Sequence, residues 1–455
     1  KLSTWSMLRF GLAAAFALSF LSSPLFAWSE HAMLGYYGLI TMLEIKNAQP
    51  VPAESLESFL QKEEAGLEKV LADIEEWNKN LVVYPVPTPE IAFKRTGIDH
   101  KRRFLEALRM DPESRTPLYL QLLPGQEAGG RPAFPVKDIS VFKNPMWIAQ
   151  TRFTTIREGE AVLPLEVVAS ACDEPDYGFD IGIWQDNNSP HSKKFNMGIQ
   201  PFGNPNLEYG SQAPVHMGFY HEAGIIYLLA GFLKRTYPEM RVHQAYALSR
   251  FAFRTGHPYW GFRFMGWGLH YVQDLTQPYH ARVLPGVGTL RMLWINFMDI
   301  IGRHEGKKNI VQLVSNRHLA LENFQRRIMT RDLRNKDLNQ PYWFALQNTE
   351  FDSKYNHFNK KYLRDVLTEE SVSKSDELSR EIMALMPVRL VDDPGVEFEE
   401  EKGSMDLLRT METNQPGSVS QFANVLARLT GAAGVHSRNY VRAILATQDT
   451  YDSVN

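Results

Sequence analysis

Residues 259–280 read YWGFRFMGWGLHYVQDLTQPYH, and this stretch decides the fold class. Its aromatic residues recur at helical spacing, which predicts a buried core helix. His270 and Asp274 are four residues apart, so both side chains project from one face of that helix. An imidazole and a carboxylate at this spacing can bind one metal ion. Pro278 ends the helix, and the turn after it brings His280 back toward the same place.

His318 and Glu322 form a second pair with the same spacing, on a helix predicted over 308–330. Such a pair taken alone is usually an ordinary pair on a helix surface. Beside the first constellation it becomes a candidate second group of metal ligands. Burying ionisable groups in an apolar helix costs several kcal/mol unless they are paired or bound to a metal.

Composition limits the class of protein. The chain has 455 residues, 44% hydrophobic and 22% charged, which excludes a disordered chain. The formal charge of −3 requires neither nucleic acid nor an anionic membrane as partner. The single cysteine, Cys172, excludes disulfides within the chain and thiolate metal clusters. A transition-metal site must therefore be built from carboxylates and from the 13 histidines.

Residues 1–27 have the pattern of a secretory signal peptide. Lys1 and Arg9 precede an apolar run, FGLAAAFALSFL, and Ala27 provides a small residue at the cleavage site. We therefore expect a secreted or periplasmic protein whose mature chain begins at Trp28. The alternative is an uncleaved N-terminal anchor.

The rest of the sequence predicts a mainly α fold, with one large helical domain and long loop insertions. Helical periodicity covers 28–46, 54–80, 158–172, 219–235, 242–256, 259–277, 289–303, 308–330, 375–386 and 417–447. Stretches rich in Pro and Gly predict loops near 110–150 and 181–215, of which the second is expected to be functional or to bind a partner. Residues 388–455 carry no motif and are expected to form a C-terminal helical extension.

The segment HYVQDLTQPYH at 270–280 resembles the signature of the zinc-dependent phospholipases C of bacteria, whose fold the single-strand-specific zinc nucleases share. The resemblance implies a helical catalytic domain over 28–387. It implies three zinc ions in a cleft and a tryptophan at the mature N-terminus. The implied metal ligands are Trp28, His31, Asp173, His216, His270, Asp274, His280, His318 and Glu322.

Two of these positions have alternatives. Asp173, in the context VASACD, is taken as a zinc ligand and as the catalytic residue that orients or deprotonates the attacking water. Asp176 and Asp180 are the alternatives to it. His216, in the context HMGFYH, is preferred to His221.

The resemblance also implies a reaction, the hydrolysis of phosphodiester bonds by a zinc-bound hydroxide. The leading expectation is a phospholipase C that acts on phosphatidylcholine-like phospholipids at a membrane surface. Glu322 stands where the nucleases typically have aspartate, and one cysteine cannot form their disulfides. The alternatives are a single-strand-specific nuclease or nucleotidase, with nucleic acid as substrate, and a non-catalytic exported zinc-binding protein.

Overall fold

The computed structural model describes residues 30–95, 98–143, 148–203, 208–398, 406–449 and 451–452. The predicted signal peptide and Trp28 lie outside these residues. The predicted mainly α fold is confirmed, since the described chain is built from helices with two small sheets. Among the described helices, none combines the length and the apolar character that crossing a membrane requires.

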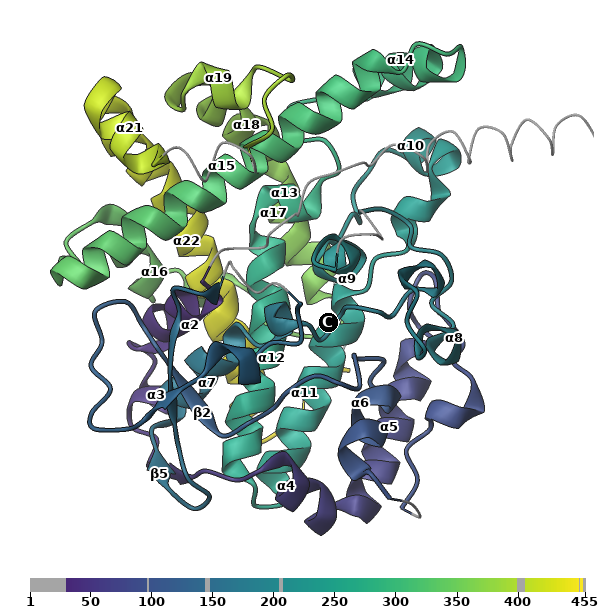
Figure 1. Cartoon of the computed structure of the whole chain (residues 1–455), viewed down its shortest axis with the longest axis vertical. Coiled ribbons are helices and arrows are strands. Elements are labelled where there is room, and N and C mark those ends of the chain that lie inside the picture. The colour runs from purple at the N-terminus through teal and green to yellow at the C-terminus, as the bar shows by residue number, and fades with distance from the viewer. Residues whose placement is uncertain are drawn as a thin grey trace, which may run out of the picture.

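The centre of the molecule is a group of helices around α12 (Pro258–Thr276). Its partners are α11 (Pro238–Arg254), α7 (Pro164–Cys172), α2 (His31–Leu39) and α22 (Pro416–Leu445). In Figure 1 these helices lie together in the middle of the view. A proline in the first turn favours the start of α12, and its residues from Tyr259 to Thr276 are all buried. The predicted core helix is therefore confirmed.

Glycines let the neighbouring helices approach α12 closely. A Cβ atom added at Gly268 would lie 1.9 Å from the hydroxyl oxygen of Tyr440 on α22. A Cβ atom added at Gly266 would lie 2.6 Å from the carbonyl oxygen of Val168 on α7. Larger residues at these positions would push α7 and α22 away from the helix that carries His270 and Asp274.

A second group of helices covers the upper part of Figure 1. The long α15 (Glu305–Asn335) crosses the view, and α14 (Thr289–Ile300) extends from it at the upper right. Helices α18 (Ser375–Leu385) and α21 (Leu407–Asn414) pack on α15 and α22. Helix α22, in the predicted C-terminal extension, also packs along α2, α12 and α16 (Pro341–Gln347), so it is part of the core.

Two predicted helices are interrupted. The segment predicted as one helix over 54–80 is divided at Glu63 into α4 (Leu56–Lys62) and α5 (Glu64–Asn78). The segment predicted over 219–235 contains only α10 (Gly224–Leu229) and the 3-10 turn η7 (Gly231–Lys234). Periodicity alone did not show these breaks, because tertiary packing sets where a helix ends.

The predicted loop near 110–150 contains part of a small antiparallel sheet. Its strands are β2 (Tyr119–Leu122), β3 (Ala133–Phe134) and β4 (Arg152–Thr155), in the order β2-β4-β3. A second sheet pairs β1 (Val51–Pro52) with β5 (Ala161–Val162). Strand β2 packs against α7, which places Gln121 beside the end of that helix.

The remaining elements are α3 (Leu43–Lys46), η1 (Pro89–Ile91), α6 (His100–Ala107), η2 (Val136–Asp138), η4 (Pro175–Tyr177), η5 (Gln185–Asn187), α8 (Ser192–Phe195), η6 (Gly210–Gln212), α9 (Ala213–His216), α13 (Pro278–Ala281), η8 (Asp352–Lys354), η9 (Leu363–Thr368), α17 (Glu369–Ser373) and α19 (Val388–Val391).

Candidate metal centre

Three buried groups of side chains can each hold a metal ion, and together we call them the metal centre. The groups are His31, His270 and Asp274; Asp176, His216 and His270; and His280, His318 and Glu322. Within each group the possible ligand atoms all lie within 4.8 Å of one another. Seven of the nine predicted ligands are therefore brought together. Of the other two, Trp28 lies outside the described residues and Asp173 lies in none of the groups.

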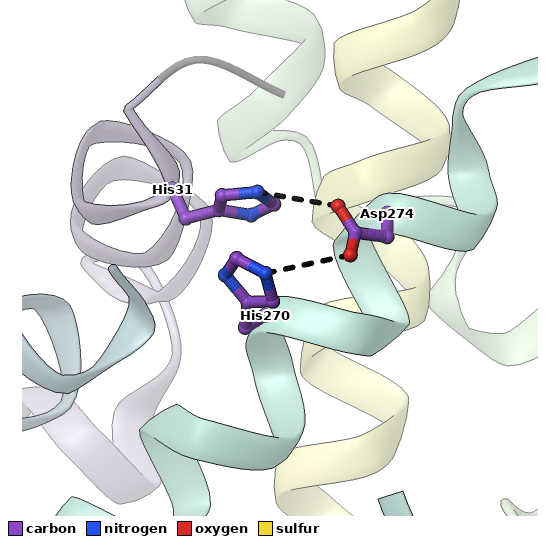
Figure 2. Close-up of side chains that lie close together, drawn as sticks. All are labelled: His31, His270 and Asp274. Atoms are coloured by element: carbon purple, nitrogen blue, oxygen red, sulfur yellow. Dashed lines mark ion pairs between the residues drawn. The ribbon is translucent and has the colours of Figure 1, made fainter. Parts of the chain in front are cut away.

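The metal centre joins helices that are distant in the sequence. Helix α12 supplies His270 and Asp274 one turn apart, and α2 supplies His31 opposite them (Figure 2). His216 ends α9. The turn at Pro278 starts the short α13, which brings His280 to the same region. Helix α15 provides the remaining pair one turn apart.

Asp274 belongs to the first group and also contacts the second. Its Oδ1 is 3.3 Å from Nε2 of His31, and its Oδ2 is 3.4 Å from Nε2 of His270 (Figure 2). The same Oδ2 is 2.9 Å from Nδ1 of His216. A carboxylate with its two oxygens facing different histidines is suited to bridge two cations.

Hydrogen bonds fix which nitrogen three of the histidines present to the centre. The Nδ1–H group of His31 donates to Oε1 of Gln273 at 2.9 Å, and that of His270 donates to the carbonyl of Cys172 at 2.7 Å. The Nδ1–H group of His280 donates to the carbonyl of His216 at 3.0 Å. With Nδ1 protonated, each neutral ring has its lone pair on Nε2, the nitrogen that faces the neighbouring ligands.

His216 is oriented the other way round. Its Nε2 lies 3.3 Å from Oδ2 of Asp180, and its Nδ1 points to Asp274. Asp180 is itself held by Arg241, whose Nε is 2.8 Å from Oδ1, and by the hydroxyl of Tyr271. Asp180 thus orients His216 rather than joining one of the metal-binding groups.

The three candidate aspartates lie at different places relative to the metal centre. Asp176 lies on η4 in one of the groups, with Oδ1 3.7 Å from Nε2 of His270. The hydroxyl of Tyr209, from the predicted loop over 181–215, donates to the same oxygen at 3.2 Å. Asp173 accepts from the backbone N–H of Ala32 at 3.2 Å and from the Gln121 amide. The arrangement therefore brings Asp176 to the metal centre and leaves Asp173 at its edge.

The preferred histidine of the other uncertain pair is also the one at the centre. His216 is 4% exposed and lies among Asp274, Asp180 and His270, whereas His221 is exposed. The ring of His221 is hydrogen-bonded through Nε2 to the carbonyl of Arg364 at 2.7 Å.

In the third group the ligand atoms lie close together, and neighbouring side chains contact them. Nε2 of His318 is 2.7 Å from Oε1 of Glu322, and Nε2 of His280 is 3.8 Å from the same oxygen. The amide of Gln277 donates to that oxygen at 3.1 Å. The ring of Tyr279 stacks on His318 with an interplanar angle of 10°, which limits the rotation of the imidazole.

Burial and charge shift the protonation of these groups in different directions. Burial raises the pKa of Asp176 to about 7. Burial opposes the charge on Asp274, but His270 and the hydrogen bonds from His216 and His31 hold its pKa well below the usual range. Burial likewise opposes the charge on His216, yet hydrogen bonds to Asp180 and Asp274 raise its pKa to about 10. A metal ion that binds Nδ1 of His216 would compete with a proton for that atom.

The donor set fits a metal ion. Nε2 of His31, Oδ1 of Asp274 and Nε2 of His318 are buried and have no hydrogen-bond partner of acceptable geometry within the part of the chain that is described. Leaving such atoms unsatisfied is costly. A cation in the first group would satisfy His31 and Asp274, and a second cation in the third group would satisfy His318. The groups contain nitrogen and oxygen but no sulfur, which suits zinc and related divalent metals.

Sequence reasoning missed the residues that orient the ligands. Gln273 directly precedes Asp274 and lies on the same helix face as His270, so its position three residues after a histidine was an available signal. Tyr209, Gln121 and Arg241 come from other segments, and nothing in the sequence links them to the centre.

No family model, no curated protein and no solved structure matches the chain.

Proposed function

We propose that the protein is a zinc-dependent phosphodiester hydrolase of the phospholipase C type. The observation that carries the proposal is the set of three histidines whose Nδ1–H groups are fixed by acceptors and whose Nε2 atoms converge around Asp274 and Glu322. Two of these acceptors are backbone carbonyls. Outer hydrogen bonds of this kind are typical of histidines that bind metal. The same arrangement supports the proposed resemblance to the bacterial zinc phospholipases C.

Bound zinc would supply a water-derived nucleophile near neutral pH and would neutralise charge on the phosphate. The residues of the chain would bind the zinc and fix the orientation of its ligands. Asp274 would be shared between the first two groups, because its Oδ1 lies near Nε2 of His31 in one group and its Oδ2 lies near Nδ1 of His216 in the other. Asp176 lies with His216 and His270 in one of the groups and would be a ligand of the bound zinc. Tyr209 holds Asp176 by a hydrogen bond and limits its rotation.

Helix α14 favours a lipid as the substrate. Four large apolar side chains, spaced as on one helix face, are 52–83% exposed: Leu290, Trp294, Phe297 and Ile301. Arg291, on the same helix, and Arg303, just after its end, are exposed cations. Helix α14 also extends away from the central helices (Figure 1). An amphipathic helix with aromatic residues and flanking cations is suited to lie in the headgroup region of a membrane.

The proposal includes export and cleavage before Trp28. A free α-amino group at Trp28 would be available as a ligand beside His31, which begins α2. A mature chain that carries one extra residue before Trp28 should then bind less zinc. Unchanged zinc binding by that chain would contradict the role of Trp28.

The test is a comparison of substrates on the zinc-loaded and the chelated protein. We expect release of phosphocholine from phosphatidylcholine, loss of that activity on chelation, and no nucleotide release from single-stranded DNA. Nucleotide release alone would identify the nuclease, and no release from either substrate would identify a zinc-binding protein without turnover. Asp274→Asn should abolish the activity, whereas Asp73→Asn, at an exposed position on α5, should leave it unchanged.

A further inference from the structure

A second feature of the molecule is a cavity of about 690 Å³ at one end of α15. We call it the arginine cavity, because six arginines line it: Arg152, Arg326, Arg327, Arg331, Arg334 and Arg409. They come from β4, α15 and α21, which are far apart in the sequence. Only three carboxylates, those of Glu30, Asp406 and Glu412, line the same space, so the lining has a surplus of three positive charges. The volume is in the range of small-molecule sites.

Part of the positive charge in the arginine cavity is neutralised. Nη1 of Arg327 lies 3.0 Å from Oδ2 of Asp406, and Arg331 pairs with Glu412. Arg331 also lies 3.3 Å from Oδ1 of Asp332. These pairs fix two of the guanidinium groups and use two of the three lining carboxylates.

The other arginines leave charge available for a ligand. Among the residues that the structure describes, Arg326, Arg334 and Arg409 form no ion pair, although Arg326 and Arg334 lie near enough to Glu30 for their charges to oppose the rise in its pKa that burial causes. Arg326 is half-buried, so its guanidinium group is partly desolvated, while Arg334 and Arg409 are exposed. Like charges gathered around one cavity repel one another, and an anion in the cavity would relieve that repulsion. With Asp332 counted, a surplus of two positive charges remains, which favours a dianion over a single carboxylate.

The arginine cavity adjoins the metal centre. Arg326 follows Glu322 by one turn of α15, a rise of about 6 Å along the helix axis. Glu30, which lines the cavity, directly precedes His31. None of the six arginines belongs to the metal-binding groups, so the cavity can be tested separately from the metals.

We propose that the arginine cavity binds a small phosphate-bearing anion through Arg326 and Arg334. Guanidinium groups present paired N–H donors that match the oxygens of phosphate, and a phosphate dianion would compensate most of the surplus charge. The ligand is either free phosphate or a phosphate monoester, the class of product that a phospholipase C releases. The binding itself does not depend on the proposed activity.

The experiment is calorimetric titration of the full chain with inorganic phosphate and with glycerol 1-phosphate. Each titration is done with the zinc-loaded and with the chelated protein, so that phosphate bound to metal is recognised by its loss on chelation. We expect one phosphate per chain to remain bound after chelation. In Arg326→Gln/Arg334→Gln this binding should weaken at least tenfold. Tighter binding of glycerol 1-phosphate would identify the ester as the ligand, and tighter binding of inorganic phosphate would identify the free anion.

The matched control is Arg254→Gln, at an exposed arginine that ends α11 and lies outside the cavity. Its phosphate binding should equal that of the unaltered protein. The single variant Arg334→Gln changes only an exposed side chain and replaces the double variant if the latter fails to fold. Absence of phosphate binding after chelation would overturn the proposal, as would equal weakening in Arg254→Gln. Tighter binding of a single-stranded oligonucleotide than of either phosphate would also overturn it.

Discussion

Nε2 of His31 lies 3.3 Å from Oδ1 of Asp274, so the first helix of the described chain supplies one side of a site whose other side is on α12. Both residues are completely buried. An imidazole and a carboxylate this close to other ligands need a proton or a cation between them.

Asp176 and Asp173 should differ in their effect on metal binding. Asp176→Asn removes a carboxylate that faces His216 and His270, so we expect metal affinity to fall about 100-fold or more. This loss is larger than the one expected when a residue that only orients a ligand is replaced. Asp173→Asn keeps an oxygen for the N–H of Ala32 and should cost less. Metal content by mass spectrometry and chelator competition measure both. A larger loss in Asp173→Asn would restore the ligand that the resemblance favoured.

Gln273 should act on the metal through His31. Gln273→Leu removes the acceptor for Nδ1–H of His31 and frees the ring to turn, so zinc affinity should fall about 10–100-fold. Chelator competition measures this change. Gln325→Leu, at a buried glutamine on α15 outside the metal-binding groups, is the control and should keep full affinity. Equal losses in the two variants would mean that the effect is one of general stability.

Gly268 should tolerate no side chain. A methyl group there would overlap the hydroxyl of Tyr440, so Gly268→Ala should lower the free energy of unfolding by about 1–3 kcal/mol. Denaturant unfolding measures the change. Gly417→Ala, where an added Cβ meets no atom within 4 Å, should be close to neutral. A Gly268→Ala variant as stable as the unaltered protein would show that α22 can move without cost.

His243 should make stability depend on pH. The ring is stacked on Trp77 at 3.8 Å, and burial lowers its pKa to about 3 despite the charge of Asp449. Between that pKa and the ordinary value near 6.5, the unfolded chain binds a proton that the folded chain does not. Above about pH 6.5 His243 therefore does not reduce the free energy of unfolding. As the pH falls from about 6.5 toward 3, uptake of a proton by the unfolded chain lowers that free energy.

His243→Phe should flatten this part of the profile, because phenylalanine keeps the stacking and cannot bind a proton. Unfolding free energies between pH 4 and pH 7 measure the slope. Acid also displaces metal, so both proteins are compared after chelation. An unchanged slope in His243→Phe would assign the acid sensitivity to other groups.

Helix α14 should be required for binding to membranes and not for the hydrolysis of a soluble substrate. Trp294→Ser/Phe297→Ser removes two exposed aromatic side chains, so we expect binding to phosphatidylcholine vesicles to weaken at least ~10-fold. Hydrolysis of a soluble short-chain phosphatidylcholine should be unchanged. Phe344→Ser, at a side chain that is 60% exposed on α16, is the matched control. If hydrolysis of the soluble lipid fell as much as binding to vesicles, a membrane-docking role for α14 would be contradicted.

Some of the candidate site follows from helix geometry and could be predicted. His270 and Asp274 are four residues apart on a helix whose periodicity is clear, and His318 and Glu322 repeat the spacing. The effect of Pro278 on the chain direction also follows from local chemistry. The two members of each pair lie close together in the structure, because they are about one helical turn apart.

The choice among the three aspartates could not be predicted in the same way. Asp176 lies on a 3-10 turn after α7, where no regular period relates a residue number to a direction. Its place beside His216 depends on how η4 packs against α12 and α9. The break at Glu63 between α4 and α5 was missed for a similar reason, since no Pro or Gly marks it. Tertiary contacts decide such positions.

The pairing of Gln273 with two distant residues has a consequence for biosynthesis. Its Oε1 holds His31, 242 residues away, and its Nε2 donates to Oγ of Ser437 on α22, 164 residues further along the chain. A ribosome makes His31 before Ser437, so a nascent chain that has not reached residue 437 lacks part of the hydrogen-bond network that orients His31. In the proposed metalloprotein, His31 would therefore be held for metal binding only after Ser437 has been synthesised.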